Sequence, residues 1–227
     1  MSEPVSDLET HLGYWLRYVS THVSQAFARK VEARGVTYAT IDLTSEAYRG
    51  FSVGFANGAL WPLLHFRLGL MHFRREDYEA YLSVNQSFAE SLGTVLQPED
   101  TLWAHDYHMI PLGRMLRERG FHGPLGFFLH IPFAPPSMME ALPVAREMIA
   151  DLCAYDLVGF QTEEHARDFR DCAQRMLGAT VQGEWVRLNG RSMRVFADPI
   201  GIDAEAFRKD AVRAANDKLV QRVAGSL

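Results

Sequence analysis

The sequence predicts an α/β protein: a Rossmann-like, mostly parallel sheet with flanking helices, preceded by a long amphipathic helix. Three observations support this class. Short apolar runs alternate with amphipathic stretches of helical length, which is typical of βαβ units. Polar clusters follow two of the apolar runs, as they do at the carboxyl ends of parallel strands. The chain has 227 residues, of which 48% are hydrophobic, enough to bury a sizeable core.

The amino-terminal segment has the pattern of a single helix. Apolar residues recur at three- and four-residue steps over residues 8–34, and Gly35 is a plausible stop signal. Residues 37–43 then alternate and are rich in β-branched residues, which predicts a strand. Thr44 follows as a candidate helix cap.

A helical region comes next. Residues 51–95 carry helical patterns that Gly54, Gly58, Pro62 and Gly69 interrupt, and residues 75–96 have the pattern of one amphipathic helix. After this region strands and helices alternate. We expect strands at residues 101–104, 125–130 and 157–160, helices at 108–119, 138–154 and 163–177, a hairpin of 184–188 with 192–196 about Asn189 and Gly190, and a last helix from Ala204.

Composition excludes several classes of partner. A formal net charge of -5 and a pI near 6.0 argue against nucleic acid, whose partners usually present a basic face. No basic region followed by an apolar core opens the chain, and no apolar run reaches the ~18 residues of a membrane span. We therefore expect a cytoplasmic protein with no membrane partner. The sequence is compatible with a homo-oligomer. Cys153 and Cys172 have no metal-type spacing and are expected to be idle thiols.

The polar cluster that follows the first predicted strands is the best candidate site. Residues 102–113 read LWAHDYHMIPLG, and GFFLHIPF follows at 126–133. His105, Asp106, His108 and His130 would meet at one edge of the sheet, an arrangement that suits a polar small molecule. The first three could also ligate a metal, but neighbouring residues at a strand end point in different directions, so we expect none.

Five segments in order carry a family resemblance: SEAYRGFSVGFANGALWPLLHFR, LWAHDYHMIPLGRMLRERG, GFFLHIPFAPPSMMEALP, AYDLVGFQTEEHARDF and DPIGID. Over residues 37–207 the chain resembles the amino-terminal domain of the trehalose-6-phosphate synthase family. These are retaining glucosyltransferases of the GT-B type, with two Rossmann-like domains facing across a cleft. The resemblance implies transfer of glucose from UDP-glucose to glucose 6-phosphate, giving trehalose 6-phosphate and UDP, without a metal or cofactor.

The resemblance also implies roles for four residues. Asp106 matches an aspartate that hydrogen-bonds hydroxyls of the acceptor glucose, and His130 matches a histidine beside the reacting sugars; these two are the expected catalytic residues. Trp61 matches the tryptophan that shapes the acceptor pocket. Ser52 stands where the family usually has a tyrosine in contact with the acceptor phosphate, so its phosphate contact is the least certain of the four.

The chain also departs from the family pattern. The family's first strand, glycine-rich loop and phosphate-binding arginine have no counterpart ahead of the matched region, and its second domain, which UDP-glucose requires, would begin near Leu227. We expect an incomplete GT-B domain at residues 37–207, with helical segments at 1–36 and 208–227, and little or no activity of this chain alone. Residues 8–34 resemble the first helix of multiple-antibiotic-resistance regulators. The alternative function is therefore a noncatalytic sugar-phosphate-binding or regulatory module with a dimerisation helix.

Overall fold

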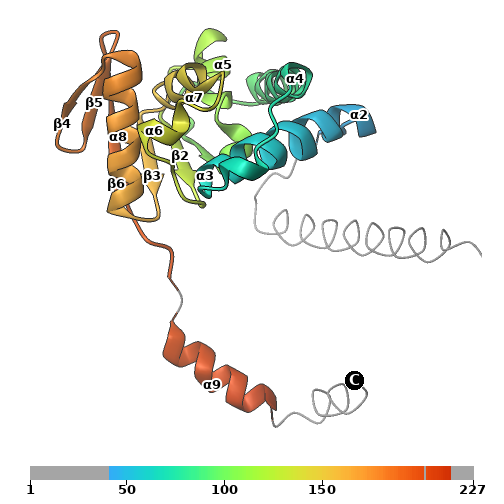
Figure 1. Ribbon diagram of the computed structural model, residues 1–227, viewed down its shortest axis with the longest axis vertical. Coiled ribbons are helices and arrows are strands. Elements are labelled where there is room, and N and C mark those ends of the chain that lie inside the picture. The colour runs from blue at the N-terminus through green and yellow to red at the C-terminus, as the bar shows by residue number, and fades with distance from the viewer. Residues whose placement is uncertain (1–40, 202, 216–227) are drawn as a thin grey trace, which may run out of the picture. The chain divides into compact units, whose positions relative to one another are not determined.

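A mixed sheet with the strand order β1-β2-β3-β6-β5-β4 lies at the centre of the computed structural model, which describes residues 41–201 and 203–215 (Figure 1). The strands β1, β2, β3 and β6 pair in parallel, whereas β6, β5 and β4 pair antiparallel. Their bounds are β1 Leu102–His105, β2 Leu125–Leu129, β3 Leu157–Phe160, β4 Thr180–Gln182, β5 Trp185–Leu188 and β6 Arg191–Ala197. The predicted fold class, a mostly parallel sheet with flanking helices, is confirmed.

The antiparallel part of the sheet grows from the predicted hairpin. Asn189 and Gly190 connect β5 to β6 with φ angles of 51° and 78°, and positive φ at both central residues is the requirement of a type I′ turn. Strand β4 was not predicted, because three residues are too few to show a period. It pairs Val181 with Val186 and ends the sheet on this side.

The described residues also form helices, several of which are short. Their bounds are α2 Ser45–Tyr48, the π-helix η1 Arg49–Leu60, α3 Trp61–Leu64, α4 Arg75–Gly93, α5 Leu112–Glu118, α6 Pro136–Met139, α7 Ala145–Leu152, α8 Glu163–Leu177 and α9 Ala204–Ala215, with 3₁₀ turns at η2 Leu68–Leu70 and η3 Tyr107–Met109. Helix α8 packs across β3 and β6, while α4 packs against η1 and α5 (Figure 1). None of the residues of α9 is buried.

The predicted interruptions at Gly54, Gly58 and Pro62 are wrong, because α2, η1 and α3 follow one another without a break. A β-carbon at Gly54 would lie 2.4 Å from Asp77 Cγ on α4, so the absence of a side chain lets the two helices approach closely. Pro62 lies where η1 passes into α3, and Gly58 O, one helical turn before it, accepts from His72 N at 2.8 Å instead of from the missing proline N–H. In η1 the hydrogen bonds run to the fifth residue, as from Trp61 N to Ala56 O.

Prolines also shorten two of the predicted helices. The expected helix at 138–154 is split into α6 and α7, and Pro143 lies in the gap. The expected helix at 108–119 becomes the turn η3 followed by α5, with Pro111 at the cap of α5. Proline has no N–H to donate, and it disfavours helical backbone at the residue before it, so each helix begins only after its proline.

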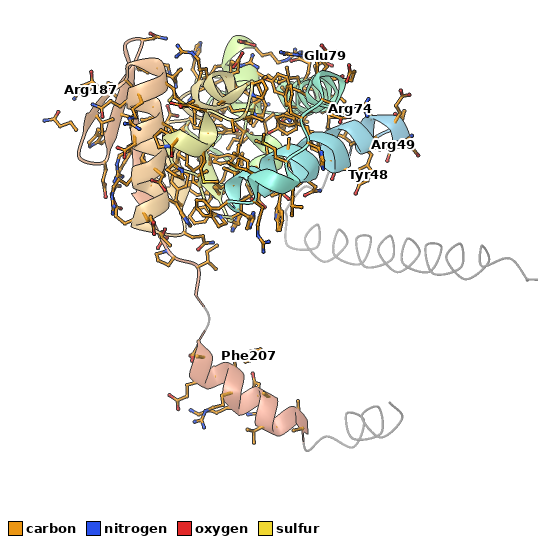
Figure 2. All side chains as sticks on the ribbon, in the orientation of Figure 1. Tyr48, Arg49, Arg74, Glu79, Arg187 and Phe207 are labelled. Atoms are coloured by element: carbon orange, nitrogen blue, oxygen red, sulfur yellow. The ribbon has the colours of Figure 1, made fainter. Side chains whose placement is uncertain are left out.

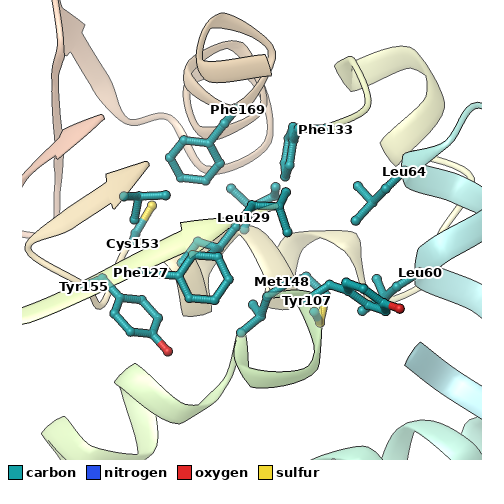
Figure 3. Close-up of a cluster of buried hydrophobic side chains, with 14 of the residues drawn as sticks. Leu60, Leu64, Tyr107, Phe127, Leu129, Phe133, Met148, Cys153, Tyr155 and Phe169 are labelled. Atoms are coloured by element: carbon teal, nitrogen blue, oxygen red, sulfur yellow. The ribbon is translucent and has the colours of Figure 1, made fainter. Parts of the chain in front are cut away.

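The core lies between the sheet and the helices. Phe127 and Leu129 of β2 are fully buried and point to the same side of the sheet, among residues from several helices (Figure 3). On α8, Phe169 packs against Phe133 and Phe160, with ring centroids 5.5–5.6 Å apart. Both cysteines are buried and unpaired, and burial raises the pKa of each thiol to about 12. This agrees with their expected lack of reactivity.

Charged side chains such as Arg49 of η1 and Glu79 of α4 are exposed, and so is the apolar ring of Tyr48 on α2 (Figure 2). The described residues from Leu43 onward belong to one unit. The predicted helix at 8–34 lies outside the described residues, as does most of the strand predicted at 37–43, of which residues 41–43 adopt neither helix nor strand. Within the described part, no helix is both long and apolar enough to cross a membrane.

Candidate functional site

Asp106 stands at the end of β1, where the chain turns into η3. Its backbone N–H donates to Phe128 O at 2.8 Å, which extends the pairing of β1 with β2 by one residue. Its side-chain Oδ1 accepts from Tyr107 N at 3.1 Å and so begins the turn. Because Oδ2 makes no hydrogen bond to any described residue, this oxygen of the half-buried carboxylate can accept from a ligand.

The backbone of Asp106 is strained. Its φ of 70° and ψ of 163° lie outside the regions that residues with a side chain usually adopt. Such a conformation costs on the order of 1–3 kcal/mol and persists only where the surroundings hold it. Strain of this kind at the end of a sheet strand is typical of a functional position.

His105 and His130 meet beside Asp106. Nδ1 of His105 lies 3.0 Å from Nε2 of His130, and their ring centroids are 5.2 Å apart. One ring must donate and the other accept, so the acceptor nitrogen carries no proton. Burial lowers the pKa of His105, and His130 lowers it further, against the opposing effect of Asp106. Of the four residues expected to meet at the carboxyl ends of β1 and β2, His105, Asp106 and His130 lie at these strand ends, whereas the ring of His108 packs against Phe51 of η1 with centroids 5.5 Å apart.

A chain of polar contacts joins η3 to η1. Tyr107 donates its hydroxyl to Asn57 Oδ1 at 2.7 Å, and Asn57 Nδ2 donates to Ser52 Oγ at 3.4 Å. Ser52 is only 7% exposed and its hydroxyl already has this partner. The structure therefore places Ser52 inside the packing of η1, where a phosphate would have little access to it.

Trp61 lies at the start of α3 and is 40% exposed. Its ring stacks on His65 with centroids 4.0 Å apart, and His65 Nδ1 bonds to Trp61 O at 2.8 Å. Among the described residues, His65 is the one ring that the Trp61 indole contacts. The structure therefore does not join Trp61 to the histidines at the strand ends. Its exposed face is available to form one wall of a ligand site.

Three residues that the sequence does not predict as part of the site donate hydrogen bonds to the backbone carbonyls of η3. Tyr81 donates to Tyr107 O at 2.6 Å, Asn85 to His108 O at 3.0 Å, and Tyr155 to Met109 O at 2.8 Å. Burial raises the pKa of both tyrosines well above 10, so each remains a hydroxyl donor. At about 1 kcal/mol for each such bond, the three together are comparable to the strain at Asp106.

A sequence signal existed for one of these residues only. Asn85 falls on the buried stripe of α4, with Tyr78, Tyr81 and Ala89, where an apolar residue is expected. Tyr155 gives no such signal, because its partners are about 46 residues away in the chain.

The described residues contain no group of three or more His, Cys, Asp and Glu that could hold a metal ion. His105, Asp106 and His108 follow one another at a strand end, and burial lowers the pKa of His108, whose ring packs against Tyr107. The strand ends instead offer two imidazoles and one carboxylate oxygen that makes no hydrogen bond to a described residue. These groups suit a ligand with several hydroxyls, since a carboxylate forms charge-assisted bonds to such donors.

The fold and the position of this site define a GT-B-like glycosyltransferase domain, with polar side chains at the carboxyl edge of a mostly parallel sheet. A model of glycosyltransferase family 20 matches residues 8–225. The chain belongs to this family. The match begins at residue 8, so it includes residues 8–34, which lie outside the described residues.

Known members of the family give the same assignment. The chain is 40% identical over 195 residues to trehalose-6-phosphate synthase of Cronobacter sakazakii, which covers 85% of this chain. It is also 40% identical to the crystal structure of a UDP-forming alpha,alpha-trehalose-phosphate synthase from Burkholderia vietnamiensis, with a TM-score of 0.78 over 83% of this chain and 40% of that one. The corresponding enzyme of Burkholderia xenovorans, in complex with glucose-6-phosphate, is 36% identical with a TM-score of 0.76, over 82% of this chain and 42% of that one. The chain spans 41% of the length of the Cronobacter enzyme.

Proposed function

We propose that this chain supplies the acceptor half of a trehalose-6-phosphate synthase site, at which glucose 6-phosphate binds and receives glucose from UDP-glucose. The observation that carries the proposal is the strained Asp106, whose Oδ2 makes no hydrogen bond to a described residue and which directly follows His105, the partner of His130. The family to which the chain belongs supports it, as does the Burkholderia xenovorans relative described with glucose-6-phosphate.

Each side chain has a role that follows from its chemistry. Asp106 accepts hydrogen bonds from sugar hydroxyls and thereby fixes the acceptor, whose orientation governs a displacement at the face of the donor sugar. His130 lies beside the reacting sugars, and His105 contacts it at 3.0 Å. Trp61 offers an exposed indole, and sugars stack favourably on such rings through their apolar faces. These residues bind and orient the acceptor, and the departing diphosphate would be stabilised by groups outside this set.

Calorimetric titration with glucose 6-phosphate tests the proposal. Asp106→Asn keeps the shape of the side chain but loses the charge. We expect binding about 10-fold weaker than in the unmodified chain, because a charge-assisted bond contributes about 1.5–3 kcal/mol. Asp171→Asn is the matched control, since Asp171 is an exposed aspartate on α8. Equal affinities of the two variants would contradict the assignment of Asp106, and no binding by the unmodified chain would contradict the acceptor site.

A further inference from the structure

Three consecutive carbonyl groups of the turn after Asp106 are each held by a donor from outside the turn. The carbonyls of Tyr107, His108 and Met109 accept from Tyr81 Oη, Asn85 Nδ2 and Tyr155 Oη, at 2.6, 3.0 and 2.8 Å. Within the turn itself, Met109 N donates to Asp106 O at 3.0 Å. The backbone of the turn is thus held through its carbonyl groups, by donors that come from other segments of the chain.

The three donors are held rigidly. Each is 0% exposed; Tyr81 and Asn85 lie on α4, and Tyr155 follows α7. Tyr155 also accepts from Gly113 N at 2.9 Å, and its ring lies where a β-carbon on Gly113 would be only 2.6 Å away. Donors from α4 and from the segment after α7 therefore converge on one turn of three residues.

Asn85 gives the most direct sign of a role beyond packing. Its Nδ2 donates both to Tyr81 O and to His108 O at 3.0 Å, whereas its buried Oδ1 has no partner among the described residues. Rotating the amide by half a turn would set that oxygen against two carbonyl oxygens, so the orientation is fixed. An unpaired buried oxygen is unfavourable, and a leucine of similar size would avoid it. The presence of an amide at this buried position is explained by its hydrogen bond to the carbonyl of His108.

We propose that Tyr81, Asn85 and Tyr155 are positioning residues for Asp106: by binding the carbonyls of the next three residues they keep Asp106 in its left-handed conformation. This aims the free carboxylate oxygen at the acceptor before the acceptor arrives. The inference rests on the proposed function, because it assigns these residues a purpose in acceptor binding. None of the three contacts the acceptor; they act through the backbone of the turn.

Removal of single hydroxyl groups tests the proposal in the full chain. Tyr81→Phe and Tyr155→Phe each lose one donor and keep the ring. Tyr78→Phe is the matched control, because Tyr78 is on α4 and buried like Tyr81, but its hydroxyl bonds to no described residue. We expect Tyr81→Phe to weaken glucose 6-phosphate binding at least 5-fold and Tyr78→Phe to change it less than 2-fold. Asn85→Leu provides a second donor loss that preserves size, should a tyrosine variant fail to fold.

Amide hydrogen exchange of Met109 gives a readout that needs no ligand. This amide closes the turn onto Asp106 O, so we expect its exchange to quicken at least 10-fold in Tyr81→Phe and Asn85→Leu, and to stay unchanged in Tyr78→Phe. Unchanged exchange in the donor variants, or equal acceptor affinity in Tyr81→Phe and Tyr78→Phe, would overturn the positioning role. If the unmodified chain binds no glucose 6-phosphate, the proposed function fails, and the exchange rates decide by themselves whether the three donors hold the turn.

Discussion

Replacing Asp151 with asparagine is expected to change how the stability of this protein depends on pH. Asp151 lies on α7 with its side chain only 4% exposed, and Oδ1 accepts from Arg114 Nε at 2.5 Å. Its Oδ2 is buried and has no partner among the described residues. Burial raises the pKa of Asp151 to about 6; Arg114 lowers it, whereas Glu118 and Glu147 raise it.

The magnitude follows from the difference between the two states. The folded protein holds a proton on Asp151 up to about pH 6, whereas the unfolded chain releases it near the ordinary value of 3.8. Between these values the folded state binds more protons, so the free energy of unfolding falls as the pH rises. At about 1.4 kcal/mol per pKa unit, Asp151 costs the folded state about 3 kcal/mol between pH 4 and pH 7. Asparagine is uncharged throughout and avoids this loss.

Urea denaturation at a series of pH values provides the assay, with the unmodified chain and Asp151→Asn measured side by side. We expect the stability of the variant relative to the unmodified chain to rise by about 3 kcal/mol from pH 4 to pH 7 and to stay constant above that. Asp171→Asn, which changes an exposed aspartate on α8, should show no such rise. A difference between Asp151→Asn and the unmodified chain that does not vary with pH would refute the reasoning, since it would mean that burial does not control this carboxyl group.

Two further substitutions test the packing. The side chain of Arg117 is 12% exposed, and it bonds to Asp156 at 2.6 Å and to three backbone carbonyls. Arg117→Ala should therefore lower the free energy of unfolding, measured by urea denaturation, by about 2–4 kcal/mol; a loss under about 0.5 kcal/mol would contradict this. Gly54→Ala would set a β-carbon 2.4 Å from Asp77 Cγ and should lower the stability measured by thermal denaturation by about 1–3 kcal/mol. Gly93→Ala, with open space around it, should be neutral or slightly stabilising. Equal effects of the two substitutions would argue against the close approach of η1 and α4.

The sequence predicts the sheet well because each strand has a recognisable local sequence pattern. The runs at Leu125–Leu129 and Leu157–Phe160 are apolar and bounded by turn residues, and the Asn189–Gly190 pair has the chemistry of a tight hairpin. The helical region was less predictable. The sequence predicts that Gly54 interrupts the helix. Its structural role instead depends on Asp77, which is distant in sequence and close in space. A local pattern cannot distinguish a glycine that ends a helix from one that allows a second helix to pack closely.

The same distinction applies to the site. The positions of Asp106 and His130 could be predicted, since each follows a strand of one parallel pair. The burial of Ser52 could not, because it depends on the i to i+5 hydrogen bonds of η1, which bring Ser52 and Asn57 together. The donors beneath η3 were also missed. Their role depends on contacts 23 to 46 residues apart in the chain, which no periodicity records.

The π-helical stretch η1 also bears on how this region can change in length. Ser52 and Asn57 face each other because they are five residues apart on a helix that closes its hydrogen bonds at that spacing. An inserted or deleted residue between them would rotate one side chain away from the other and carry Trp61 around the helix axis. A loop could absorb such a change, but this helix would transmit it to the indole. We therefore expect the spacing from Ser52 to Trp61 to be fixed, even where the residue types along it vary.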